Sequence, residues 1–224
     1  MFTKATFNFL DELTANNDRT WFEANKPRYE SLVREPALEF IAAMGPVLEK
    51  FAPAFRAEPR KVGGSLMRVF RDTRFSRDKT PYKTNIGIQF RHELGRDVHA
   101  PGFYLHVAND ECFLGAGCWH PEADALGRIR DLIAAQPERW FAACDERKFR
   151  VHWALAGDSL TRPPRGYAVD HPAIDDLKRK DLIGLAPLSA AEITVPGLVK
   201  LAGARFATAA PLMKFLCEAL DVRY

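Results

Sequence analysis

The spacing of apolar residues predicts helices at the start of the chain. Phe9, Leu10 and Leu13 recur at helical spacing after Thr6, which we expect to cap the helix. The stretch at 25–51 has the same period and contains prolines, so it predicts a longer helix with a kink or a break. The first quarter of the chain is therefore expected to be helical.

The pattern changes to a period of two in the middle of the chain. Segments near 86–92, 102–108 and 111–117 are expected to be strands, and Asn109 and Asp110 are expected to form a tight hairpin turn between the last two. Alternation with one apolar side is typical of an antiparallel sheet that packs on helices by one face. The residues predicted to be buried under those helices are Ile88, Phe90, Leu105 and Val107.

Helical spacing returns after residue 120. Helices are predicted at 120–135 and 137–146, and SAAE at 189–192 matches a capping box that opens a short helix. The segment 157–172 is expected to be an irregular connection, and a last helix is predicted at 196–220, bent or interrupted near Pro211. Helices, then strands, then helices predict the fold class α+β, with an antiparallel sheet packed on one face by helices in a single domain over 1–224.

Composition changes this picture little. Hydrophobic residues make up 47% of the 224 positions and charged residues 27%, which is the ordinary mix of a globular chain with a sizeable core. Neither a membrane-length apolar run nor the G-x-G-x-x-G or Walker spacing is present, so no membrane span and no cofactor are expected. The cysteines lack paired spacing, so they predict buried thiols in a reducing cytoplasm and no metal site. They are Cys112, Cys118, Cys144 and Cys217.

Positive charge is concentrated in one segment, RVFRDTRFSRDKTPYKTN at 68–85. Its residues 68–83 include six arginines and lysines and only two aspartates, whereas the formal net charge of the whole chain is +3. Several of these cations are therefore expected to bind an anion, because arginine grips carboxylate or phosphate with two hydrogen bonds and lysine supplies a compact charge. Two other interpretations stay open, namely an ion-paired structural loop and a contact with a macromolecule.

Two polar residues on the second predicted strand favour the ligand interpretation. Tyr104 and His106 alternate with core positions, so both are expected on the less apolar face of the sheet. Gly115 and Gly117 on the next strand leave room above that face. His106 could act as an acid, as a base or only as a hydrogen-bonding group.

The basic segment resembles the signature of a family of uncharacterised, mainly bacterial proteins known as domain of unknown function 2461. The resemblance extends to FLDELTANNDRTWFEANKPRYE near the start, to PGFYLHV and GAGCWHPEADALGRIR in the middle, and to RPPRGYAVDHPAIDDLKRK towards the end. It implies one full-length domain, and it implies no catalytic role for any position. The positions that match the signature and the leading motif are Arg68, Arg71, Asp72, Arg74, Phe75, Asp78, Lys79, Pro81, Tyr82, Lys83, Asn85, Asn17, Arg19, Trp21, Phe22 and Asn25.

These observations together predict a cytoplasmic protein that binds a small anionic ligand, phosphorylated ligands included, in a basic pocket above the sheet. A hydrolase or transferase reaction on that ligand stays open, with an aspartate orienting arginines or taking a proton. The alternative is a non-enzymatic adaptor that binds nucleic acid or an acidic protein through the basic segment; phosphate contacts would make its affinity fall steeply with salt. The predicted ligand-binding residues are Arg68, Arg71, Asp72, Arg74, Asp78, Lys79, Tyr82, Lys83, Tyr104 and His106.

Overall fold

The computed structural model describes residues 1–95 and 101–224. Its first quarter is helical, as the apolar spacing predicts. The helix predicted over 25–51 has no break, and a π-helical segment comes directly before the turn that contains Pro36. The elements are α1 (Lys4–Ala15), α2 (Arg19–Ala24), α3 (Lys26–Tyr29), the π-helix η1 (Glu30–Arg34) and α4 (Glu35–Leu48).

Thr6 is not the N-cap of α1, so the predicted position of the cap is wrong, but Thr6 takes part in the capping box as the third residue of the helix. The N-cap is Thr3, whose backbone N–H donates to Oγ1 of Thr6 at 3.1 Å. The Thr6 hydroxyl donates in turn to the carbonyl of Leu32 at 2.9 Å. Pro36 has no N–H with which to bond this carbonyl, so the buried Thr6 satisfies it and joins α1 to the longer helix.

The strands form an antiparallel sheet in the order β1-β2-β3-β4-β6-β5. The predicted strands and the α+β class are confirmed, and Ile88 pairs with Leu105, which pairs with Leu114. The backbone N–H of Ala108 donates to the carbonyl of Glu111 at 3.0 Å, closing the expected hairpin turn. The strands are β1 (Phe55–Arg56), β2 (Ile86–His92), β3 (Gly102–Val107), β4 (Cys112–Cys118), β5 (Ala154–Ala156) and β6 (Leu182–Leu188).

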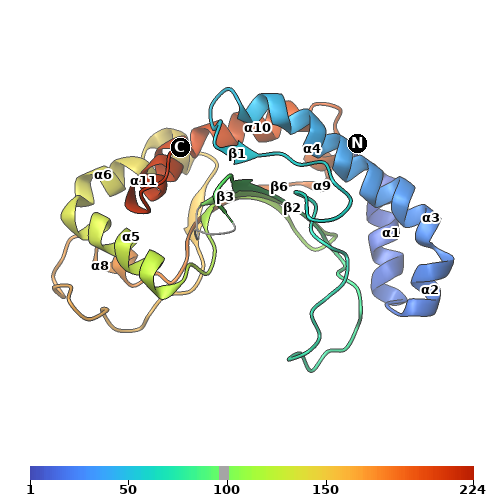
Figure 1. Ribbon diagram of the computed structural model, residues 1–224, viewed down its shortest axis with the longest axis horizontal. Coiled ribbons are helices and arrows are strands. Elements are labelled where there is room, and N and C mark those ends of the chain that lie inside the picture. Colours follow the sequence, from blue (N-terminus) through green and yellow to red (C-terminus); the bar gives the residue numbers. More distant parts are fainter. Residues whose placement is uncertain (96–100) are drawn as a thin grey trace.

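The apolar side of the sheet faces helices (Figure 1). Helix α4 contacts β1 and β2, while α10 (Leu198–Thr208) and α11 (Ala210–Ala219) contact β4. In Figure 1, α4 and α10 lie above the sheet, with α1–α3 at one side of the molecule and α11 at the other. The four strand residues predicted to be buried, Ile88, Phe90, Leu105 and Val107, are all fully buried.

The second half of the chain adds helices and two strands. Ser189 and Glu192 form the predicted capping box, with the Glu192 N–H donating to the Ser189 hydroxyl at 3.2 Å. The predicted last helix is interrupted between α10 and α11, as Pro211 suggests. The remaining helices are α5 (Ala123–Ala135), α6 (Pro137–Cys144), α7 (Arg147–Arg150), α8 (Ile174–Leu177) and α9 (Ala190–Thr194).

The apolar pattern did not indicate strands β5 and β6. Gly184 and Pro187 interrupt the alternation in β6, and proline is ordinarily excluded from the middle of a sheet. Pro187 is tolerated because β5 pairs with β6 only at residues 183–185. On the side of β6 that faces β5, no strand therefore lies opposite Pro187 to accept a hydrogen bond from it. Length also matters, since a three-residue strand such as β5 carries almost no periodic signal.

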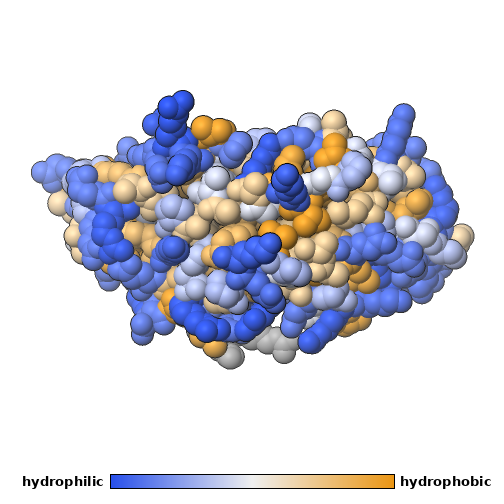
Figure 2. Space-filling view, turned by 90° about the horizontal axis from the view of Figure 1, so that it is seen from above, coloured by the Kyte–Doolittle hydropathy of each residue, from blue (hydrophilic) through white to orange (hydrophobic). Residues whose placement is uncertain are grey.

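The two faces of the sheet differ in polarity. The face turned away from α4 and α10, here called the open face, carries Gln89, Arg91, Tyr104, His106 and Phe113. Seen from the helix-covered side, hydrophobic residues gather near the middle of the surface and hydrophilic ones dominate both ends (Figure 2). The four cysteines are buried, as expected. A candidate polar site is therefore to be sought on the open face and at its edges.

Candidate functional site

Residues 69–83 form a narrow ribbon that descends from the start of β2 (Figure 1). The Arg71 N–H donates to the Pro81 carbonyl at 2.9 Å, and the Lys83 N–H donates to the Val69 carbonyl at 2.7 Å. The end of this ribbon, residues 71–80, is called the basic loop below. Most of the charge of the signature segment therefore projects away from the sheet.

The base of the ribbon is fixed to the first two helices. The Asn17 side chain donates to the Tyr82 carbonyl and accepts from the Tyr82 N–H, both at 3.0 Å. The buried Tyr82 ring stacks on Phe22, with centroids 4.0 Å apart. These contacts hold the ribbon against α1 and α2. The motif at residues 9–30 and the basic segment therefore share a structural role.

Within the basic loop, the arginines bind the two aspartates of the same segment. Arg74 makes two hydrogen bonds to Asp72, Nε to Oδ1 at 3.0 Å and Nη2 to Oδ2 at 2.7 Å. Arg71 forms an ion pair with Asp78 and also bonds the Thr80 hydroxyl. These guanidinium groups lower the pKa of Asp72 and of Asp78 to about 2. The arrangement is what an ion-paired loop requires, and it leaves these two arginines already partnered.

The other residues at the end of the loop are more exposed. Lys79 Nζ donates to the Thr73 carbonyl at 2.8 Å. Arg77 has no ion pair among the residues that the structure describes. Phe75 is 94% exposed, with the Arg74 guanidinium 5.8 Å from its ring centre. The loop therefore presents an aromatic ring to solvent among cations.

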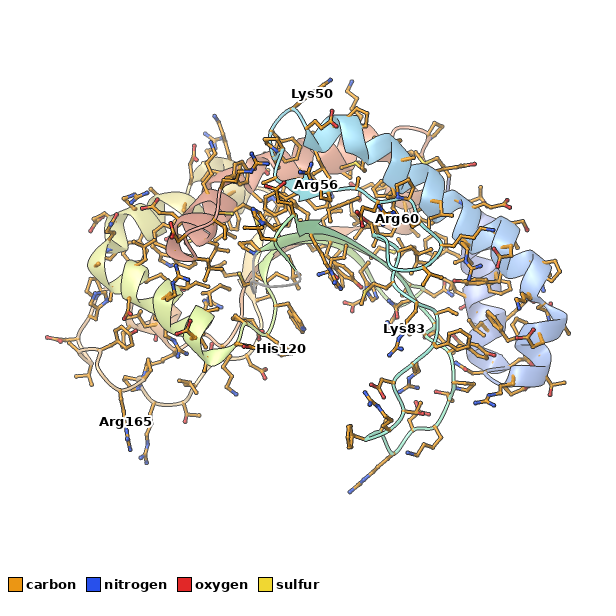
Figure 3. The ribbon with its side chains drawn as sticks, viewed as in Figure 1. Lys50, Arg56, Arg60, Lys83, His120 and Arg165 are labelled. Carbon is orange, nitrogen blue, oxygen red and sulfur yellow. The ribbon has the colours of Figure 1, made fainter. Side chains whose placement is uncertain are left out.

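A second gathering of cations lies at the edge of the sheet, beside β1 and β2. It surrounds a cavity of about 810 Å³, here called the edge cavity. Arg60 and Lys83 extend from the chain between β1 and β2 in Figure 3. The charged residues that line the cavity are Arg56, Arg60, Lys61, Arg68, Lys83, Arg91, Glu58 and Glu93.

The shape of the edge cavity depends on the turn at residues 58–65. The Ser65 hydroxyl accepts from the Glu58 N–H at 3.0 Å, and the Ser65 N–H donates to the Glu58 carbonyl at 2.9 Å. Gly64 allows this closure, because a Cβ there would lie 2.4 Å from the Glu58 carbonyl oxygen. Ser65 itself is buried and its carbonyl accepts from Gln89 of β2 at 2.8 Å. The turn is therefore held to the sheet by backbone bonds.

The cations of the edge cavity outnumber its carboxylates. Glu93 is shared by Arg56 and Arg223, and Glu58 lies 3.5 Å from Arg60. In the part of the chain that the structure describes, the remaining lining cations have no carboxylate partner. They are Lys61, Arg68, Lys83 and Arg91. An anion in this cavity would meet cations that form no salt bridge with a carboxylate of the described residues, although Asp72 lies near enough to Arg68 for that guanidinium to contribute to lowering the pKa of Asp72.

Lys83 is the most constrained of these cations. Its side chain is partly buried, and burial together with the nearby Arg68 guanidinium lowers the pKa of the Lys83 ammonium. Both causes disfavour the charged lysine, and a bound anion would oppose both. Lys83 therefore lies where an anion would be stabilising.

Tyr104 and His106 lie on the open face as predicted, but they bond one another rather than line the edge cavity. The Tyr104 hydroxyl is 3.1 Å from Nδ1 of His106, and the Asn85 amide is 3.5 Å from the same nitrogen. Burial raises the pKa of Tyr104 to about 12 and lowers the pKa of His106, so both rings favour their neutral forms. A Cβ at Gly87 would lie 2.7 Å from the Tyr104 hydroxyl and 2.8 Å from Sδ of Met67, which lines the cavity. The pair thus adjoins the cavity across Gly87.

The structure does not bring the predicted residues into one pocket. Arg68 and Lys83 line the edge cavity, Tyr104 and His106 adjoin it, and Tyr82 lies at the base of the ribbon. The rest lie in the basic loop, namely Arg71, Asp72, Arg74, Asp78 and Lys79. Sequence analysis did not select the other lining cations, Arg56, Arg60, Lys61 and Arg91. A signal existed, because three of them fall within the eight residues before Gly64 and the fourth falls on the polar side of β2.

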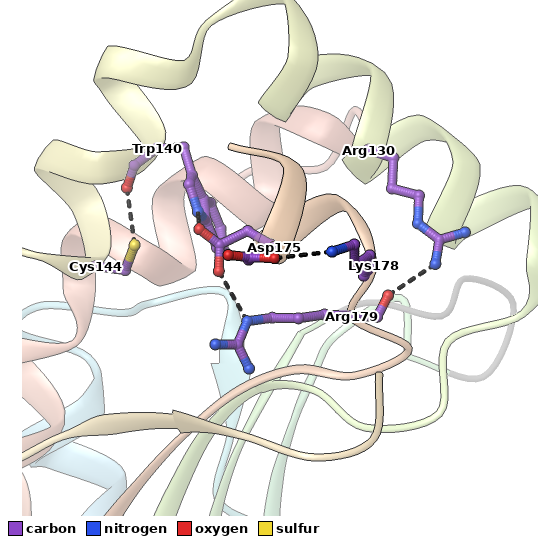
Figure 4. A network of polar contacts seen from close by, with 7 residues as sticks. Arg130, Trp140, Cys144, Asp175, Lys178 and Arg179 are labelled. Carbon is purple, nitrogen blue, oxygen red and sulfur yellow. Dashed lines mark hydrogen bonds and ion pairs between the residues drawn. The ribbon is translucent and has the colours of Figure 1, made fainter. Parts of the chain in front are cut away.

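A further charged cluster lies among the helices at the opposite side of the molecule and has a structural explanation (Figure 4). Asp176 accepts from the indole of the buried Trp140 and from Nε of Arg179, both at 2.8 Å. Arg130 donates to the Arg179 carbonyl at 2.8 Å, which ties α5 to the residues after α8. Asp175 and Lys178 form a separate pair at 3.0 Å. These contacts join α5, α6 and α8, and they leave each carboxylate with a partner.

Two negative findings concern the described residues alone. Across 1–95 and 101–224, no group of three or more His, Cys, Asp or Glu side chains is arranged to hold a metal ion. In the same residues, no helix combines the length and apolar character that crossing a membrane requires. The absence of a bound metal stays a prediction, which elemental analysis of the purified protein would check.

Fold and site together define an α+β protein with a basic cavity at the edge of an antiparallel sheet. The chain belongs to the family described as Conserved hypothetical protein (DUF2461), which matches residues 5–215. Comparison with curated proteins and with solved structures gave no match. The family extends from α1 into α11 and so includes both the basic loop and the edge cavity.

Proposed function

We propose that this protein binds a small anionic ligand, such as a phosphorylated metabolite, in the edge cavity. The observation that carries the proposal is the pair Arg68 and Lys83, two neighbouring cations that line the cavity without a carboxylate partner in the described part of the chain. Like charges held together are mutually repulsive, and an anion between them relieves that repulsion. Arginine and lysine are also the side chains that suit phosphate best.

The size of the cavity agrees with a small molecule. About 810 Å³ falls within the range of pockets that enclose metabolites and drug-sized ligands. Gln89 and Ser65 add polar groups, and Met67 and Leu66 add apolar surface. A ligand with a charged group and a larger organic part would therefore find both kinds of contact.

Thermal unfolding in the presence of anions tests this proposal. Inorganic phosphate and pyrophosphate should raise Tm relative to chloride at equal ionic strength, because a ligand at a hundredfold excess over Kd stabilises the folded state by about 2.7 kcal/mol. Arg68→Met and Lys83→Met remove the two charges but keep most of the side-chain volume. Each should abolish most of the anion-dependent gain.

Arg77→Met and Arg74→Met are the matched controls. They remove cations from the same signature segment that do not line the edge cavity. Both should keep the wild-type response to phosphate. A response that is lost in these two variants and retained in the cavity variants would move the anion site to the basic loop and overturn the proposal.

The exposed Phe75 favours a second candidate function, contact with nucleic acid through the basic loop. Single-stranded nucleic acid is bound by aromatic rings that stack on bases, beside cations that contact phosphates. Phe75 is 94% exposed and lies between Arg74 and Arg77. Fluorescence anisotropy with a labelled oligonucleotide tests this function. Binding that weakens steeply with salt and is lost in Phe75→Ala would support it, and binding unaffected by Phe75→Ala would contradict it.

A further inference from the structure

His120 and Asp181 meet at one end of the paired strands β4 and β6. His120 follows β4 by two residues, Asp181 directly precedes β6, and Cys118 pairs with Leu182 between them. One carboxylate oxygen of Asp181 accepts from the His120 backbone N–H at 2.8 Å and lies 3.1 Å from Nδ1 of the His120 ring. Asp181 is 1% exposed, whereas the His120 side chain is 64% exposed. A buried carboxylate therefore holds an exposed imidazole.

The backbone around this pair is restricted. His120 has φ 48°, in the left-handed region that few residues other than glycine adopt. The second oxygen of Asp181 accepts from the Asp158 N–H at 3.0 Å, next to Gly157 with φ +97°. A Cβ at Gly157 would lie 2.5 Å from Cβ of Asp181. Such conformations persist only where surrounding contacts enforce them, and they gather at functional sites.

The contact orients the imidazole ring. A carboxylate oxygen accepts hydrogen bonds, so the tautomer that suits this 3.1 Å contact has its proton on Nδ1 and its lone pair on Nε2. Among the residues that the structure describes, Nε2 has no hydrogen-bond partner. The neighbouring Trp119 is 58% exposed, and its ring lies 4.7 Å from the imidazole. In Figure 3, His120 and Lys83 both lie below the sheet, His120 towards the left of the view and Lys83 towards the right.

A structural role for Asp181 does not require the imidazole. Asp181 already joins the two turns through the backbone N–H groups of His120 and Asp158. Glycine or asparagine would adopt the backbone conformation of residue 120 at least as easily. The ring also makes an edge contact with the exposed Trp119, but a contact of this kind does not require an imidazole. What histidine adds is a base with one nitrogen oriented and the other free.

We propose that His120 is a general base, positioned by Asp181, for the hydrolysis of an ester. Nε2 takes a proton from a water molecule, whose oxygen bonds to the carbon or phosphorus of the ester. The bond from that atom to the leaving oxygen breaks, and the imidazolium returns its proton to the leaving group, so acid and alcohol are formed. The Asp181 carboxylate stabilises the imidazolium. The inference extends the function beyond binding and does not depend on the edge cavity.

Hydrolysis of two chromogenic probes by the full chain tests the proposal. The arms are p-nitrophenyl acetate, which is uncharged, and p-nitrophenyl phosphate, and they distinguish a carbonyl from a phosphorus centre. His120→Gly is the main variant because glycine adopts φ 48° readily, so the fold should persist. At least one probe should lose roughly tenfold or more of its rate. His152→Asn, a histidine without a carboxylate partner in the described residues, is the control and should keep the rate.

Chemical rescue distinguishes a catalytic base from a residue that has only a structural role. Imidazole added to His120→Gly should restore hydrolysis with saturation, because it can occupy the space beside Asp181. The same addition should fail in the double variant His120→Gly/Asp181→Asn, whose fold is checked by circular dichroism. If the double variant unfolds, rescue of His120→Gly by imidazole alone tests whether His120 acts as a base. A wild-type rate in His120→Gly, hydrolysis of neither probe, or absence of saturable rescue would overturn the proposal. Loss of phosphate stabilisation in the cavity variants has no bearing on it, since p-nitrophenyl acetate carries no charge.

Discussion

The basic loop and the edge cavity both gather arginine and lysine side chains, but they differ in where the opposite charges lie. In the basic loop, Asp72 and Asp78 belong to the same short segment as the arginines that they bind. In the edge cavity, the cations come from three separate segments, and two glutamates serve only part of them. The segment with the most charged residues in the sequence is therefore not the place where most unpaired cations gather in the folded protein.

This difference decides which region has a reason to bind an anion. Exposed ion pairs contribute little to stability and are screened by salt, but each pair occupies the hydrogen-bonding groups of its arginine. A ligand at the basic loop would have to displace a carboxylate that is already in place. A ligand at the edge cavity would meet Arg68 and Lys83, which repel one another. The predictions below test this contrast, from the largest expected effect to the smallest.

Removing the anchor of the ribbon should have the largest effect. Tyr82→Ala deletes a buried ring that stacks on Phe22, and large-to-small substitutions of buried aromatic residues cost about 3–5 kcal/mol. Urea unfolding of the variant measures this loss. Phe75→Ala is the control, because a ring that is 94% exposed should contribute almost nothing. Equal losses in both variants would mean that the base of the ribbon is not the anchored part.

A methyl group at Gly87 should disturb the boundary between the cavity and the Tyr104–His106 pair. The Cβ of Gly87→Ala would lie 2.7 Å from the Tyr104 hydroxyl, so the ring must shift, and overpacking of this kind costs about 1–3 kcal/mol. Tyr104→Phe removes the clashing oxygen. The double variant should therefore recover part of the stability lost in Gly87→Ala, as measured by thermal unfolding. Additive losses would show that the two side chains do not meet there.

Because of Lys83, the free energy of unfolding should change with pH in the alkaline range. Its pKa in the folded protein lies below its ordinary value of 10.5, because of burial and of Arg68. Between the two values the unfolded chain binds more protons, so the free energy of unfolding should rise as pH increases through this window. Denaturant unfolding at a series of pH values below 10.5 measures the slope, which Lys83→Met should flatten. A slope unchanged in that variant would assign it to another group.

The aspartates of the basic loop should show the smallest effect, at acid pH. Arg74 and Arg71 lower the pKa values of Asp72 and Asp78 to about 2, from an ordinary value of 3.8. Their contribution to stability is therefore complete above the ordinary value and is lost as pH falls towards about 2. Carboxyl titration by NMR measures both midpoints directly. Midpoints near the ordinary value would mean that the loop arginines are unpaired in solution.

Much of the fold could be predicted from periodicity, and the failures have local causes. The alternation in β2 and β3 is clean because one side of each strand faces helices and the other is polar. Strand β6 was not indicated because Gly184 and Pro187 replace alternating residues, and Pro187 is acceptable only where β5 has ended. The role of Thr6 depends on a carbonyl that Pro36 leaves unbonded, so it depends on a contact between distant segments.

The site was harder to predict than the fold, for a physical reason. Sequence shows that cations exceed carboxylates within residues 68–83, but it does not show which arginine reaches which aspartate. Arg71 and Arg74 find partners within the loop, whereas Arg68 lies beside cations contributed by β1 and β2. The contact between His120 and Asp181 joins residues sixty-one positions apart, so neighbouring residues gave no sign of it.

The shortness of β1 and β5 has a consequence for how the protein behaves at high concentration. These two strands end the sheet, and they contain two and three residues. An edge strand offers unpaired N–H and C=O groups to any other chain, so long flat edges promote aggregation into fibrils. Here each edge exposes only a short ladder, and Pro187 removes one donor from the part of β6 that β5 leaves uncovered. Short edge strands therefore make it unfavourable for strands of neighbouring molecules to pair with the sheet.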